Sequence, residues 1–202
     1  METIKSGINR KEVIDFYIKY DYSKKSKKIT PGELMEKLDY DNPDDIDDLF
    51  VKYGYKGGII PGFKKWDLVK LNRDDSGECA IYGGLAENCF DTECQKLKKL
   101  KENPGFKSWE PPKDKEWYFR IKTGGNIERE EALILRPAVK NEDGAKWYLE
   151  DGSGRGLYLY KNALQNPANK VYAFAYLAKL LPDKKSKFMR NKFKELFPKN
   201  EL

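Results

Sequence analysis

The sequence predicts an α+β protein with a small mixed sheet, whose central motif is a strand, a glycine-rich turn and a helix. Apolar residues recur at helical spacing before Gly54, whereas apolar and polar residues alternate after Trp66. Glycine occupies every second position of the turn at 152–156. We expect one structural unit with three parts: a helical N-terminal lobe (1–58), an α+β core (59–165) and a C-terminal helical pair (166–202).

Cap signals predict three helices in the N-terminal lobe. Asn9 stands three residues before Glu12, as in a cap, and Thr30-Pro31-Gly32-Glu33 is a capping box with proline at the first helical position. Asn42-Pro43 opens a third helix, which we expect to end at Gly54. The acidic run at 39–48 does not fit an EF-hand calcium loop, so a solvated helix face is expected there.

Strand and turn signals alternate through the predicted core. We expect strands over 66–71, 79–82, 116–122, 131–137 and 146–150. Turns are expected at 73–77, 124–126 and 141–144, and a helix over 93–100. The strand at 116–122 rests on the alternation of Trp117, Phe119 and Ile121 with their neighbours.

The C-terminal part predicts helices over 170–181 and 183–197, separated by Pro182. The second helix is basic, and two or three of its cations would suffice to bind the phosphates of nucleic acid. An amphipathic helix with solvated lysines is the alternative, and no helix-turn-helix pattern frames the segment. Its cations are Lys184, Lys185, Lys187, Arg190, Lys192 and Lys194.

The segment from Lys146 to Tyr158 carries the main functional signal. An apolar, aromatic strand runs into the glycine-rich turn, and a helix is expected over 157–164. Glycine lets the backbone approach a ligand closely, and a helix start offers N–H groups and the positive end of its dipole. Arg155 adds a fork of donors that fits phosphate or carboxylate. Together these features predict a phosphate-binding turn.

A tight strand-to-helix turn without a ligand is the alternative, because glycine is common at turns. The spacing matches neither the dinucleotide-binding fingerprint nor the Walker loop. In the phosphate-binding interpretation, Arg155→Ala weakens nucleotide binding and leaves the melting of the free protein unchanged. In the alternative, Arg155 pairs with Glu150 or Asp151, so that alanine lowers stability.

The order of elements resembles the ParB/sulfiredoxin-like superfamily over roughly 117–164. An apolar strand ends in Arg136-Pro137, and Asp151-Gly152-Ser153-Gly154-Arg155 matches the Asp-Gly-x-x-Arg motif that opens a helix in that superfamily. Several members carry histidine where this chain has Gly154. Sulfiredoxins carry a reactive cysteine where it has Ser153, so reductase chemistry is not expected here.

The resemblance implies a ParB-like core that binds nucleotide phosphates, with NTP hydrolysis, phosphoryl transfer, nuclease activity or DNA binding as the outcome. The residues expected at the phosphates are Gly152, Ser153, Gly154, Arg155 and Arg136. The carboxylates expected to hold Mg²⁺ or to act as general base are Asp151, Glu150, Glu131 and Glu130. Trp147 or Tyr158 would stack on the base, with core packing as the alternative.

The chain contains no histidine among its 202 residues. This excludes a Ser-His-Asp triad, a Cys-His dyad and a histidine metal site. Phosphoryl transfer remains open, because it depends on positioning and charge stabilisation, so any catalysis is expected to use Mg²⁺ and a nucleoside triphosphate. Cys79, Cys89 and Cys94 lack Cys-x-x-Cys spacing, which favours reduced thiols over a zinc site with Asp91.

Charge and hydropathy set the expected partners and compartment. A net charge of +6 permits an anionic partner without requiring one. No stretch approaches the ~20 apolar residues of a membrane span, and the N-terminus lacks the apolar core of a signal peptide. We expect a cytoplasmic protein without a membrane partner. The functions that remain are a nucleotide-binding protein acting at a phosphate, a DNA-binding or DNA-cleaving protein, and a non-enzymatic interaction protein.

Overall fold

The computed structural model describes residues 1–24, 28–55, 59–113, 116–139, 142–179, 191 and 194–196. The chain divides into two compact units. The first comprises Met1–Lys5 and Leu68–Leu177, and the second comprises Ser6–Asp67 and Ala178–Leu202. The predicted α+β class is confirmed, because helices occur together with a six-stranded mixed sheet.

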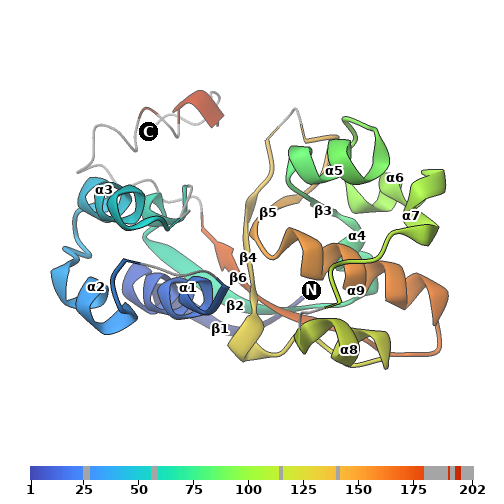
Figure 1. Cartoon of the computed structure of the whole chain (residues 1–202), viewed down its shortest axis with the longest axis horizontal. Helices are drawn as coiled ribbons and strands as arrows, with labels where there is room; N and C mark the ends of the chain where they lie inside the picture. Colours follow the sequence, from blue (N-terminus) through green and yellow to red (C-terminus); the bar gives the residue numbers. More distant parts are fainter. Residues whose placement is uncertain are drawn as a thin grey trace. The chain divides into compact units, whose positions relative to one another are not determined.

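The sheet has the strand order β1-β2-β6-β4-β5-β3 (Figure 1). Its strands are β1 (Glu2–Asn9), β2 (Lys65–Leu71), β3 (Cys79–Ala80), β4 (Leu133–Pro137), β5 (Trp147–Asp151) and β6 (Ala173–Ala178). β4 and β5 are antiparallel, β6 lies parallel to β4, and β3 lies parallel to β5. The expected strands that correspond to β2, β3, β4 and β5 are thereby confirmed.

The pairing of β4 with β5 sorts their side chains onto two faces. Leu135 lies opposite Leu149, and Arg136 lies opposite Tyr148, with a register shift between Ile134 and Leu135. Leu135 and Leu149 belong to the main apolar core. Because successive side chains of a strand point to opposite faces, Arg136 and Tyr148 lie on the face that points away from this core.

The helices of the first unit cover the core face of the sheet. They are α4 (Arg73–Gly77), α5 (Gly83–Phe90), α6 (Leu97–Leu100), α7 (Pro104–Ser108), α8 (Glu116–Lys122) and α9 (Ser153–Gln165), with the 3₁₀ turn η2 (Arg129–Glu131). α9 packs against β4, β5, α8 and α4 (Figure 1). Tyr158 of α9 stacks on Tyr118 of α8, with ring centroids 5.2 Å apart.

The second unit contains the expected helical lobe. Its helices are α1 (Arg10–Lys24), α2 (Pro31–Lys37) and α3 (Pro43–Tyr53), and the 3₁₀ turn η1 (Ile60–Gly62) follows. The predicted caps are present: the Asn9 side chain accepts a hydrogen bond from the Glu12 N–H, and the capping box at Thr30 is complete. Gly54 ends α3 in the left-handed conformation, with φ of 78°.

Two predicted elements have the wrong type. The segment at 116–122 is the helix α8, because its buried residues Tyr118 and Ile121 are one helical turn apart while Phe119 is 60% exposed. The predicted helix at 170–181 is wrong, because Ala173–Ala178 is the strand β6, which pairs with β4. The alternate residues Ala173 and Ala175 of β6 are buried.

Other boundaries also differ from the prediction. The strand β1 was not expected, and the turn at 73–77 is the short helix α4, capped by Asn72. The helix expected over 93–100 is reduced to Leu97–Leu100. α9 begins at Ser153, inside the glycine-rich turn rather than after it. The basic helix predicted over 183–197 falls largely outside the described residues.

Candidate phosphate-binding site

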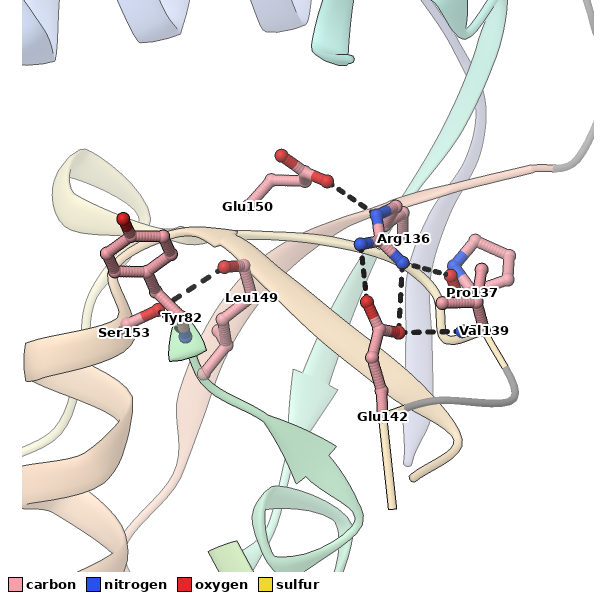
Figure 2. Close-up of polar contacts among 8 residues, drawn as sticks. All are labelled: Tyr82, Arg136, Pro137, Val139, Glu142, Leu149, Glu150 and Ser153. Atoms are coloured by element: carbon pink, nitrogen blue, oxygen red, sulfur yellow. Dashed lines mark hydrogen bonds and ion pairs between the residues drawn. The ribbon is translucent and has the colours of Figure 1, made fainter. Parts of the chain in front are cut away.

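Two helices begin next to each other, where the parallel strands β3 and β5 end. β3 and β5 are parallel neighbours, and each is followed by a helix whose first turn is rich in glycine: Gly83-Gly84 in α5 and Ser153-Gly154 in α9. The Tyr82 backbone N–H donates a hydrogen bond to the Ser153 hydroxyl at 3.2 Å. The Ser153 hydroxyl in turn donates to the Leu149 carbonyl at 3.3 Å (Figure 2). The hydrogen bond between Tyr82 and Ser153 holds the two helix starts together.

The dipoles of α5 and α9 place partial positive charge where the two helices begin. The first-turn N–H groups of an α-helix have no partner within the helix, and the dipole places partial positive charge there. Neither Tyr82 nor Gly152, the residues that precede the two helices, caps its helix with a side-chain hydrogen bond. In open α/β sheets, ligands bind outside the carboxyl ends of parallel strands, which is where both helices start.

The glycines of the turn differ in what the fold requires of them. Gly152 has φ of 90°, and a Cβ there would lie 2.5 Å from the Leu133 Cδ2 atom. A Cβ at Gly156 would lie 3.0 Å from the Leu149 Cδ1 atom, so close packing of α9 on β5 favours glycine there. A Cβ at Gly154 would meet nothing within 4 Å. Packing therefore explains Gly152 and Gly156 but not Gly154.

Arg155 points into the protein. Its side chain is 4% exposed, and its Nη2 atom lies 3.1 Å from the Asp151 carboxylate and 3.4 Å from the Ala132 carbonyl oxygen. Burial lowers the pKa of Arg155 to about 9. The guanidinium thus links the end of β5 to the residue before β4, an arrangement that matches the carboxylate-paired alternative.

Arg136 is the centre of a second buried ionic cluster (Figure 2). Its guanidinium makes two bonds to Glu142, at 2.6 and 3.1 Å, and one to Glu150 at 2.5 Å. It also lies 4.0 Å from the centroid of the Tyr148 ring. Burial acts to lower the pKa of Arg136, but the two carboxylates outweigh burial and raise the pKa. Arg136 therefore stabilises the hairpin between β4 and β5 through its two ion pairs.

The predicted catalytic carboxylates are distributed over three separate ion pairs. Glu150 pairs with Arg136, Asp151 with Arg155, and Glu131 with Arg120. Only Asp151 directly adjoins the glycine-rich turn, while Glu130 is exposed in η2. Across the part of the chain that the structure describes, no group of three or more acidic or cysteine side chains is arranged to hold a metal ion.

An exposed aromatic residue that was not among the predicted site residues stands at the start of α5. Tyr82 is 64% exposed and directly precedes α5. Trp147 is half-buried against the core, and Tyr158 is buried among aromatic rings, so core packing accounts for both. The sequence signal for the part of the site at the start of α5 is Gly83-Gly84, which follows a predicted strand as Gly152-Ser153-Gly154 does.

Comparisons with known proteins add no relative: no family model, no curated protein and no solved structure matches the chain.

None of the helices in the described ranges is long and apolar enough to cross a membrane. All three cysteines are free thiols, and burial raises the pKa of Cys79.

Proposed function

We propose that this chain is a ParB-like protein that binds a nucleotide by its phosphates where α5 and α9 begin. The observation that carries the proposal is Gly154, a glycine in the first turn of α9 that neither packing nor backbone conformation requires. Glycine lowers the stability of a helix relative to alanine, by roughly 0.5–1 kcal/mol in the middle of a helix. A ligand that lies directly against the backbone at this point supplies a reason for its presence.

The contacts within the turn suggest a division of labour. The backbone N–H groups of Ser153 and Gly154, with those of α5, would bind the phosphates. Arg155 would act as a positioning residue, because its bond to Asp151 holds the turn in place from the buried side. Tyr82 would stack on the base, because its ring is exposed at the start of α5. Arg136 pairs with Glu142 and Glu150, so it would stabilise the hairpin between β4 and β5 rather than contact the ligand.

The reaction that fits such a site is NTP hydrolysis or phosphoryl transfer. Mg²⁺ bound to the triphosphate would neutralise charge that develops during transfer. Magnesium usually takes one or two protein carboxylates besides phosphate oxygens and water, and Asp151 is the carboxylate that adjoins the turn. Glu150 and Glu131 do not directly adjoin the turn and would serve only their arginine partners, whereas Asp151 would also keep its bond to Arg155.

Calorimetric titration with ATP, CTP and GTP, with and without Mg²⁺, tests the proposal. We expect binding of at least one triphosphate and much weaker binding of the matching nucleoside, because the phosphates supply the contacts. Equal binding of nucleoside and triphosphate, or none of either, would contradict it. The second outcome would leave the two alternatives, a DNA-binding or DNA-cleaving protein and a non-enzymatic interaction protein whose glycine turn is purely architectural.

A further inference from the structure

A basic groove lies elsewhere in the first unit and consists of three connected pockets. The first, of about 410 Å³, runs from Lys70 and Arg73 to Lys170 and Tyr172. The second, of about 490 Å³, shares Arg73 with the first and continues to Lys101. The third, of about 230 Å³, shares Lys101 with the second and ends at Lys107. The three pockets are therefore neighbours, and together they are called the basic groove.

Cations dominate this groove. Lys70, Arg73, Lys101, Lys107, Lys146 and Lys170 all line it. Two of its acidic residues are already engaged: Asp75 pairs with the N-terminal amino group at 2.5 Å, and Glu78 pairs with Lys96 at 2.7 Å. Asp74 is strongly exposed and contacts only the neighbouring Arg73 side chain among the ion pairs of the described residues, at 3.4 Å. The lining of the three pockets therefore has more cationic than acidic side chains.

The basic groove is separate from the candidate phosphate site. Glu78 and Lys146 directly precede β3 and β5, whereas the two helix starts follow those strands. Leu164 and Gln165, which also line the groove, lie in the last turn of α9. A 13-residue helix is about 20 Å long, so the groove and the phosphate site lie at opposite ends of α9.

The distribution of charge favours a chain of phosphates over a single one. A small anion is held by donors that converge on one point, whereas these cations follow one another through three pockets. At one end the Lys70 ammonium lies 4.0 Å from the centroid of the Tyr172 ring, and the Tyr172 hydroxyl is 3.2 Å from Glu128. A basic groove with a half-exposed aromatic ring is the arrangement by which proteins bind single strands.

We propose that the basic groove binds single-stranded nucleic acid through its phosphates, with Tyr172 as a stacking platform for one base. Lys101 and Lys146 would bind phosphates at the middle of the strand. Binding would be largely independent of sequence, because phosphate contacts and stacking do not distinguish the bases strongly.

Fluorescence anisotropy with a labelled oligothymidylate of about 15 nucleotides tests this proposal, because single-strand sites span up to about 16 nucleotides. We expect Lys101→Ala and Lys146→Ala each to weaken binding severalfold at low salt. Each should also reduce the slope of log K against log salt by about 0.7, because each removes one phosphate contact. Lys113→Ala is the matched control, since Lys113 is exposed and lines none of the three pockets.

Substitutions of Tyr172 test the stacking platform. Tyr172→Phe should retain binding, whereas Tyr172→Ala should weaken it about tenfold. Equal losses in Lys101→Ala and Lys113→Ala, or no binding by the parent, would overturn the proposal. So would tighter binding of a duplex of the same sequence, or equal competition by polyglutamate. Because the two sites are separate, ATP should not displace the oligonucleotide, and failure of ATP to bind would contradict the phosphate site without affecting the groove.

Discussion

The backbone N–H of Tyr82 lies 3.2 Å from the hydroxyl oxygen of Ser153, although 71 positions separate the two residues in the chain. This bond joins the residue before α5 to the first residue of α9. It therefore sets the spacing of two helix starts, each of which directs backbone N–H groups toward the same edge of the sheet. The Ser153 hydroxyl has a structural role that its position in a glycine-rich turn does not indicate.

Replacement of Ser153 by alanine tests this link. The variant loses the bonds to Tyr82 and Leu149, so we expect the free energy of unfolding to fall by about 1 kcal/mol. Nucleotide affinity should fall as well, because the two helix starts would no longer be held together. Urea denaturation and calorimetric titration measure the two effects, and a variant that behaves like the parent in both would refute the link.

Replacement of Arg155 by alanine is expected to lower the stability of the ligand-free protein. The guanidinium is buried and pairs with Asp151, so its removal leaves a largely buried carboxylate without this partner. Loss of one member of such a pair lowers stability by about 3 kcal/mol. Arg155→Lys should recover only part of the loss. Unchanged melting together with lost nucleotide binding would instead indicate that Arg155 contacts the phosphate directly.

The Arg136 cluster is expected to be strongly coupled. Arg136→Met leaves Glu142 and Glu150 together without their shared cation, so we expect a loss of about 3–5 kcal/mol. Addition of Glu142→Gln should restore part of it, because one uncompensated charge is removed. Chemical denaturation of both single variants and the double variant measures the coupling. Simple additivity of the two single effects would show that the cluster does not act as a unit.

Acid sensitivity is expected to depend on Glu78. The hydrogen bond from the Lys96 ammonium lowers the pKa of Glu78 below its ordinary value of 4.5. The unfolded chain therefore binds the proton more readily than the folded one, and the stabilisation is complete above pH 4.5 and lost as the pH falls through the folded pKa. Glu78→Gln should be less stable than the parent at neutral pH, and the difference should shrink in acid. A difference that is constant with pH would contradict this assignment.

Local signals in the sequence predicted the fold where the structure is set by neighbours in the chain. The cap at Asn9, the capping box at Thr30 and the hairpin between β4 and β5 all depend on short-range geometry. The strand β6 was missed because its alanines favour helix by propensity, and its pairing with strands that are distant in the sequence, β2 and β4, makes it a strand. The helix α8 was missed because alternation selected Phe119 with Ile121, whereas the helix buries Tyr118 with Ile121, and seven residues are too few to separate the two periods.

The candidate site was predicted in part for similar reasons. The glycine-rich turn and the helix that follows it were visible in the sequence, because glycine and helix periodicity are local signals. The contribution of α5 was not, because it depends on the parallel pairing of β3 with β5. The direction of the Arg155 side chain was also not determined by spacing, since a guanidinium four residues after Asp151 can reach either that carboxylate or a ligand.

Nucleotide titration of Gly154→Ala tests the central claim most directly. Apart from its chain neighbours and its own helix backbone, the added methyl group meets no protein atom within 4 Å. The stability of the free protein should therefore stay the same or rise by up to about 1 kcal/mol. The same methyl group would lie where the phosphate approaches the backbone, and we expect the affinity for the triphosphate to fall at least about tenfold, or about 1.4 kcal/mol. Triphosphate affinity equal to that of the parent in this stably folded variant would contradict the claim that the start of α9 binds phosphate.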